Sequence, residues 1–121
     1  MSRPYRFIAV ERRGDVFCVR LRQTQLDEAM IQELAEELRD LIVANACRKL
    51  AVSLGPESPE CLYSVFLAKL ICLQRVLRER EGELVLCDVQ PDVYGIFTAC
   101  CLEQLFRFVP DFNAAVAHWT P

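Results

Sequence analysis

The sequence of 121 residues lacks the patterns by which most enzymes and cofactor-binding proteins are recognised. Its four glycines are scattered singly, so it contains neither a P-loop nor a G-x-G-x-x-G motif to hold phosphates. No G-x-S-x-G segment marks a nucleophile elbow. The lone histidine, His118, lies beside Trp119 near the end of the chain, where packing or surface exposure is favoured over a Cys–His dyad. The sequence therefore predicts a protein that is not an enzyme and that uses no cofactor.

Cysteine is plentiful, but its spacing indicates neither a metal site nor a disulfide framework. The seven cysteines include no C-x-x-C pair, and a single histidine leaves little material for a zinc site. Most of them lie in apolar runs, where cysteine behaves as a small hydrophobic residue. We expect seven reduced thiols, as in a cytoplasmic protein. The alternative is redox activity of the adjacent pair Cys100 and Cys101.

Strong charge of one sign and long apolar runs are also missing. The net charge of −3 and the isoelectric point near 5.2 argue against a general nucleic-acid-binding protein, which normally has a basic excess. The first residues do not form the apolar run of a secretion signal, and charges interrupt the longer apolar stretches. These absences predict a cytoplasmic chain with no nucleic-acid partner and no membrane insertion.

The residues that are present predict one α/β domain spanning 1–121. Hydrophobic residues make up 53% of the chain and charged residues 26%, which is typical of a globular fold with one core. Helical and strand patterns alternate after a hairpin around Gly14, so we expect a mixed, mostly parallel sheet with about four helices. The expected order is β-β-α-β-α-β-α-β-α, with strands at 5–12, 16–22, 49–54, 83–88 and 106–109 and helices beginning near 27, 59, 91 and 111.

The first helix is expected to follow Asp27, a residue type that caps helix N-termini. Leu34 and Leu38 recur at helical spacing on the side that we expect to face the sheet. The opposite side is acidic, which reflects either ordinary solvation or the steering of a basic partner. It carries Glu33, Glu36, Glu37 and Asp40.

The second helix carries the predicted binding surface. Ser58, Pro59 and Glu60 form a typical helix start, which predicts a helix from about Glu60 to Arg80. The side expected to face the sheet comprises Leu62, Val65, Phe66, Leu73, Val76 and Leu77. We interpret the opposite side as a partner-docking patch, the alternative being scattered exposed aliphatic residues. This patch comprises Ser64, Leu67, Ala68, Ile71, Arg75 and Arg78.

Three stretches of the sequence carry a resemblance to a known family. The first is the hairpin with Gly14-Asp15 at its turn, which leads through 26–29 into the Glu-rich helix. The second is EGELVLCDVQPDV at 81–93, and the third runs from 96 to 106. Together they span nearly the whole chain, and they resemble the sulphate-transporter and anti-sigma-antagonist (STAS) family. The resemblance implies that family's fold and the function of bacterial anti-sigma-factor antagonists, which bind an anti-sigma factor or kinase-like protein in signalling that regulates transcription.

The resemblance also implies a phosphorylation site. In these antagonists a serine within an Asp-Ser-[Ser/Thr]-Gly segment, at the start of the second helix, is phosphorylated by a partner kinase. Counting back from Gly82 places Ser64 at this phosphoacceptor position, where it is either a live switch or the relic of a degenerate one. With a helix starting at Pro59, Ser64 would lie more than one turn inside it, where a phosphate gains less from the helix end. The other residues of the segment depart from the family's pattern, namely Tyr63, Val65 and Phe66.

An alternative function on the same fold is a small-ligand sensor that binds a nucleotide or a lipid at the strand ends. Asp88 follows a predicted buried strand, at the position where α/β folds often bind ligands. It is either a ligand-binding residue or, more simply, an ordinary loop acid. The sequence identifies neither the partner nor the oligomeric state.

Overall fold

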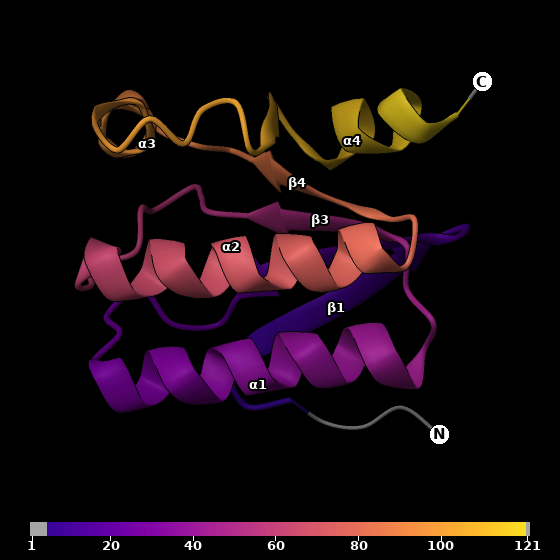
Figure 1. Ribbon diagram of the computed structural model, residues 1–121, viewed down its shortest axis with the longest axis horizontal. Coiled ribbons are helices and arrows are strands. Elements are labelled where there is room, and N and C mark those ends of the chain that lie inside the picture. The colour runs from indigo at the N-terminus through magenta and orange to yellow at the C-terminus, as the bar shows by residue number, and fades with distance from the viewer. Residues whose placement is uncertain (1–4, 121) are drawn as a thin grey trace.

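The computed structural model describes residues 5–120, which form a five-stranded sheet and four helices (Figure 1). The strands are β1 (Ile8–Arg13), β2 (Val16–Leu21), β3 (Lys49–Ser53), β4 (Glu83–Cys87) and β5 (Arg107–Val109). The helices are α1 (Glu28–Ala44), α2 (Tyr63–Glu79), α3 (Pro91–Ala99) and α4 (Phe112–Trp119). This order confirms the predicted α/β fold.

The strands lie in the sheet in the order in which they follow one another along the chain. β1 and β2 form an antiparallel hairpin, and Gly14 occupies its turn with φ of +65°, a conformation that glycine adopts without steric cost. β2, β3, β4 and β5 are parallel, so their carboxyl ends lie at one end of the sheet. The loops after these strands gather there. We call this region the loop end and define it as residues 22–28, 54–62, 88–92 and 110–111.

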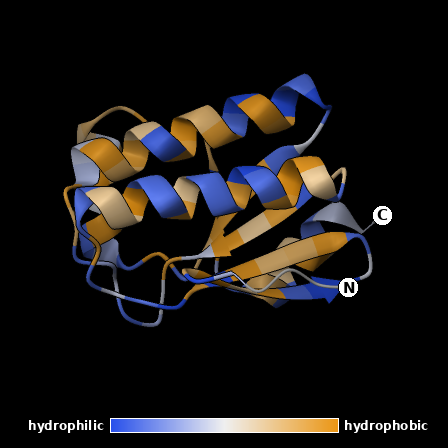
Figure 2. Ribbon diagram, turned by 90° about the horizontal axis from the view of Figure 1, so that it is seen from below, coloured by the Kyte–Doolittle hydropathy of each residue, from blue (hydrophilic) through white to orange (hydrophobic). Residues whose placement is uncertain are grey.

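α1 and α2 lie side by side on one face of the sheet (Figures 1 and 2). α1 begins as predicted, because the Asp27 carboxylate accepts a hydrogen bond of 2.8 Å from the backbone N–H of Met30. Leu34 and Leu38 are buried against the sheet, as expected from their spacing. On the sheet side, Leu84 and Leu86 of β4 belong to the same core. This layer is the larger of the two hydrophobic cores.

α4 covers part of the opposite face of the sheet. Val85 and Cys87 of β4 point to this side, so β4 is buried on both faces, which explains its continuous apolar run. Phe112 of α4 is buried in this smaller core, and the Arg20 guanidinium lies 4.5 Å from its ring centroid. α4 begins near 111 as predicted, and Asp111 caps it, because its carboxylate accepts a 2.9 Å hydrogen bond from the backbone N–H of Ala114.

The acidic side of α1 fixes the segment that enters β1. The Glu37 carboxylate accepts hydrogen bonds from the backbone N–H groups of Arg6 and Phe7, at 2.8 and 2.9 Å. Glu33 pairs with the Arg6 guanidinium at 3.3 Å, and Asp40 accepts a hydrogen bond from the Tyr5 hydroxyl. Three of the four acids predicted for this side therefore hold the protein's own chain.

Replacement of Glu37 tests this structural role. Because Glu37→Ala leaves two backbone N–H groups without their charged acceptor, we expect it to lower the free energy of unfolding by about 1–3 kcal/mol. Glu36→Ala is the matched control, since exposed Glu36 bonds, among residues 5–120, only Gln32 one turn earlier. We expect a change within a few tenths of a kcal/mol for Glu36→Ala. Equal losses in urea unfolding of the two variants would contradict the assignment.

Candidate functional site

The segment between β3 and α2 is extended at the loop end and delays the start of the helix. Glu60 forms an isolated parallel bridge with Gln25, and the backbone N–H of Leu26 donates a 2.9 Å hydrogen bond to the Glu60 carbonyl. Because Glu60 is paired in this way, it cannot begin a helix. The prediction of a helix start at Ser58–Glu60 is therefore wrong, and α2 begins at Tyr63.

Ser64 lies in the first turn of α2, as its second residue, and it is exposed. The expectation that it lies more than one turn inside the helix is corrected by the later helix start. The residue before the helix is Leu62, whose side chain cannot cap backbone N–H groups, and no side-chain hydrogen bond closes this helix end. The first turn also contains no acidic residue. Ser64 therefore lies at the N-terminus of a helix whose first N–H groups are not capped by any side chain of this helix end.

The predicted stripe on α2 is only partly exposed. Ser64, Ala68, Arg75 and Arg78 are exposed as expected, and Ile71 is half-buried against the larger core. Leu67 is 3% exposed, so its assignment to a surface patch is wrong. Leu67 lies on the same side of α2 as Gln74, two turns later, whose amide donates hydrogen bonds to the Leu84 and Leu105 carbonyls. That flank of the helix faces β4 and the segment before β5, which removes Leu67 from solvent.

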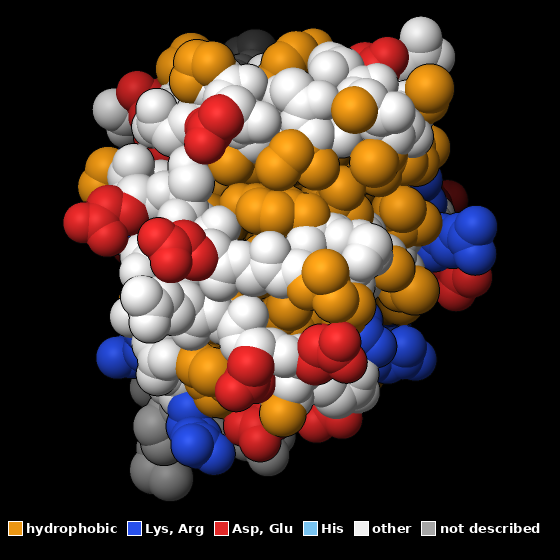
Figure 3. Space-filling view, turned by 90° about the vertical axis from the view of Figure 1, so that its left-hand side faces the viewer, with side chains coloured by type: hydrophobic (Ala, Val, Ile, Leu, Met, Phe, Trp, Pro, Cys, Tyr) orange, Lys and Arg blue, Asp and Glu red, His pale blue; other side chains and the backbone are white. Residues whose placement is uncertain are grey.

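An apolar area that the periodicity of α2 did not predict lies at the loop end. Leu62 was expected to face the sheet, but it precedes the helix and is 53% exposed. Cys61, Tyr63 and Val65 are half-buried next to it. Figure 3 shows the end of the molecule on which α1 and α2 begin, with hydrophobic side chains gathered over its middle and acidic side chains around them. We call Leu62, Ser64 and Ala68 the docking face.

The loop end concentrates negative charge. It contains one of the chain's 14 basic residues, Arg22, which donates a hydrogen bond to the Ile8 carbonyl. By contrast, seven of the 17 acidic residues lie there, although the net charge of the whole chain is only −3. Some of these acids cap helices, as Asp27 and Asp111 do. The seven are Asp27, Glu28, Glu57, Glu60, Asp88, Asp92 and Asp111.

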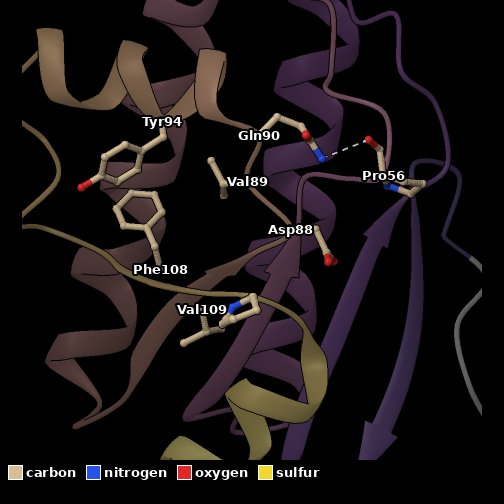
Figure 4. Close-up of a pocket in the computed structure, with 8 residues that line it drawn as sticks. Pro56, Asp88, Val89, Gln90, Tyr94, Phe108 and Val109 are labelled. Carbon is tan, nitrogen blue, oxygen red and sulfur yellow. Dashed lines mark hydrogen bonds between the residues drawn. The ribbon is translucent and has the colours of Figure 1, made fainter.

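Asp88 lines an open cleft at the carboxyl ends of β4 and β5. The cleft has a volume of about 500 Å³, and Val89, Tyr94 and Phe108 form part of its apolar wall (Figure 4). Buried Ser53 donates a 2.6 Å hydrogen bond from its hydroxyl to the Asp88 carboxylate. This pair was not predicted from the sequence, because the two residues are 35 positions apart.

The buried and half-buried thiols are poor nucleophiles. Burial raises the pKa of Cys47 and Cys61 to about 11 and that of Cys87 to about 12, so these groups are thiols rather than thiolates near neutral pH.

The His118 imidazole lies 3.0 Å from a Glu83 carboxylate oxygen. Across residues 5–120, no three metal-binding side chains gather closely enough to hold a metal ion.

The seven cysteines fall into a buried, a half-buried and an exposed group, and their rates of alkylation test this assignment. Cys18, Cys47 and Cys87 are buried, Cys61 is half-buried, and Cys72, Cys100 and Cys101 are exposed, so the expectation that most are core residues holds only in part. Under native conditions we expect rapid alkylation of the three exposed thiols and slow alkylation of the three buried ones. After unfolding without reductant, mass spectrometry should show seven labels. Fewer labels in freshly purified protein would reveal a disulfide and contradict the prediction of seven reduced thiols.

None of the helices described combines the length and the apolar character needed to cross a lipid bilayer. No family model matches the sequence. Solved structures do match it, at low sequence identity. The phosphorylated form of the Bacillus cell fate determinant SpoIIAA is 15% identical, with a TM-score of 0.68 over 92% of this chain and 98% of that chain. RsbS from Moorella thermoacetica, a single-substitution variant, is 19% identical, with a TM-score of 0.74 and 92% of each chain covered.

A third structure is an anti-sigma-factor antagonist (STAS) domain protein from Planctomyces limnophilus, which is 19% identical. Its TM-score is 0.72, and the match covers 91% of this chain and 95% of that chain. The chain therefore has the STAS fold, which confirms the fold expected from the resemblance of its sequence. At these identities the similarity concerns the arrangement of strands and helices.

Proposed function

We propose that the protein is a non-enzymatic regulatory domain that binds a protein partner, as anti-sigma-factor antagonists do, in a partner-switching pathway of the bacterial cytoplasm. Phosphorylation of Ser64 by a kinase-like partner switches this binding. The observation that carries the proposal is the position of Ser64, which is exposed in the first turn of a helix whose N-terminus has no side-chain cap. The similarity of the fold to phosphorylated SpoIIAA and to RsbS supports it.

A helix N-terminus favours a phosphate for two physical reasons. The first backbone N–H groups of α2 have no intrahelical acceptor, and the aligned peptide dipoles place partial positive charge at this end. A phosphate on Ser64 adds close to two negative charges and strong acceptor oxygens within the first turn. The sequence departures at Tyr63, Val65 and Phe66 do not remove these groups, because they belong to the backbone.

The docking face includes this serine and its neighbours Leu62 and Ala68. Leu62 supplies an exposed aliphatic side chain and Ala68 a small one that permits close approach, while half-buried Ile71 and the exposed Arg75 and Arg78 extend the surface along α2. Leu67 of the predicted patch takes no part, since it is buried. A phosphate beside an apolar contact weakens the binding of a partner there, because the charged group would lose its hydration when the contact is buried. Phosphorylation therefore releases a partner that the unmodified form binds.

The nucleotide or lipid sensor is less well supported than the protein-binding function. Nucleotides and most membrane lipids carry phosphate groups, whereas the loop end carries seven acidic residues and one arginine. Like charges raise the cost of binding such ligands at the strand ends.

The stability of the Ser64→Asp variant tests the helix end itself. An acid in the uncapped first turn interacts favourably with the helix dipole, so we expect Ser64→Asp to raise the free energy of unfolding by about 0.3–1 kcal/mol. Ala68→Asp is the matched control, because exposed Ala68 lies one turn further into α2, where aspartate is a weaker helix former than alanine. We expect that control to be destabilised in urea unfolding. Destabilisation of both variants would contradict the placement of Ser64 in the first turn.

Capture of the native partner tests the function. Affinity capture from native cytosol should recover a kinase-like partner with the unmodified chain, and tandem mass spectrometry should locate a phosphate on Ser64 in the remaining pool. We expect Leu62→Glu to abolish capture and Ser64→Asp to weaken it. Val43→Glu is the control, because Val43 is similarly exposed, at 49%, but lies near the far end of α1. Equal capture by Leu62→Glu and the unchanged chain, or phosphate only at other residues, would refute the proposal.

A further inference from the structure

We propose that the cleft beside Asp88 is a binding site for a guanidinium group carried on an aliphatic chain. The cleft lies between the β3–α2 loop, the segment from the end of β4 into α3, and the end of β5 with the loop after it (Figure 4). Ser64 on α2 is not among the residues that line it. Its volume of about 500 Å³ is within the range of small-molecule sites. The proposal rests on this cleft and does not require that Ser64 be phosphorylated.

The Asp88 carboxylate is held in one position. Its backbone adopts a left-handed conformation, with φ of +56°, and the Ser53 hydroxyl donates to one carboxylate oxygen, Oδ2, at 2.6 Å. The backbone of Gly55 also packs directly against Asp88, since a Cβ built on Gly55 would lie 2.7 Å from the Asp88 carbonyl oxygen. A carboxylate that is already fixed loses little conformational entropy when it binds a ligand.

This carboxylate pairs with no cation in the part of the chain that the structure describes. Among residues 5–120, no Lys, Arg or His side chain lies within ion-pair distance of Asp88, and no hydrogen bond is made to its second oxygen, Oδ1. An ionised carboxylate accepts several hydrogen bonds, of which the Ser53 hydroxyl supplies one. The remaining capacity, together with the acidic surroundings of the loop end, favours a cationic hydrogen-bond donor.

The other polar side chains of the cleft also favour a ligand that donates hydrogen bonds. Gln90 uses its amide nitrogen to donate a 3.4 Å hydrogen bond to the Pro56 carbonyl, which leaves its amide oxygen as an acceptor (Figure 4). Tyr94 contributes a hydroxyl, and its ring meets that of Phe108 edge-on at 5.0 Å. The remaining side chains of the lining are apolar, and they are Pro56, Val89, Phe108, Val109 and Pro110.

The shape of the cleft favours a guanidinium over a compact ammonium group. A planar guanidinium presents several N–H donors in a fixed fork that suits carboxylate and amide oxygens, and it is less strongly hydrated than an ammonium. In Figure 4 the Asp88 carboxylate points away from the Tyr94 and Phe108 rings. A ligand that reaches both parts of the lining therefore needs an apolar chain beyond its cationic head. An arginine side chain in a protein and a free alkylguanidine both have this chemistry.

Titrations of the 121-residue chain, followed by amide chemical shifts in NMR, test the site. The probes are N-acetyl-arginine N-methylamide, its uncharged citrulline counterpart and agmatine. We expect the arginine probe to cause saturable shifts at Val89, Gln90 and Tyr94, with a dissociation constant about tenfold lower than that of the citrulline probe, a factor equivalent to about 1.4 kcal/mol. Tighter binding of the arginine probe than of agmatine would indicate an arginine within a protein as the natural ligand, and the reverse order would indicate a free guanidine.

Two variants distinguish binding at this specific site from a general attraction of the cationic probe to the negative charge of the loop end. Asp88→Asn keeps an acceptor for Ser53, and asparagine tolerates the left-handed backbone, so the fold should be retained while the arginine probe binds about tenfold more weakly. Glu57→Gln removes one charge from the same end outside this cleft and should leave binding unchanged. Equal shifts with arginine and citrulline, unchanged binding by Asp88→Asn, or equal losses in the two variants would overturn the proposal.

Discussion

The pairing of Gln25 with Glu60 is the contact on which the arrangement of the loop end depends. It joins the β2–α1 loop to the β3–α2 loop and keeps the chain extended through Glu60. Because the helix cannot start before this pairing ends, α2 begins at Tyr63 with Leu62 exposed at its N-terminus. The same contact therefore determines both the position of Ser64 in the first turn and the exposure of its apolar neighbour.

The sheet explains why these features lie together. β2 to β5 are parallel, so each is followed by a loop at the same end, and functional groups of α/β folds commonly occupy that end. β3 and β4 are buried on both faces, between α1 and α2 on one side and α4 on the other. A rigid sheet of this kind fixes the loops that project from it. Two surfaces therefore lie at or beside the loop end, the docking face at the start of α2 and the cleft beside Asp88.

The sequence predicted those features that depend on neighbouring residues. Asp27 caps α1 as expected, and α4 begins near 111 as expected, because capping by an aspartate requires only the N–H group three residues later. Leu34 and Leu38 are buried as their spacing predicts. The STAS fold follows from the resemblance across the whole chain, whereas the expected place of Ser64, more than one turn inside the second helix, was wrong.

Features that depend on distant residues could not be predicted from local patterns. Ser58, Pro59 and Glu60 form a favourable helix start, but the pairing with Gln25 overrides this local preference. Leu67 is buried because its flank of α2 faces β4, which periodicity alone does not reveal. The acidic side of α1 suggested solvation or a partner, whereas Glu37 in fact holds the backbone that enters β1. The hydrogen bond between Ser53 and Asp88 likewise joins the ends of two different strands.

The start of α2 is the central element of this account, and backbone NMR measures it most directly. Secondary shifts of the Cα carbons report the local conformation of each residue from Ser58 to Phe66. The structure predicts extended values at Glu60 and helical values from Tyr63 onward. Helical values that begin at Pro59 or Glu60 would place Ser64 more than one turn inside the helix and would contradict the account.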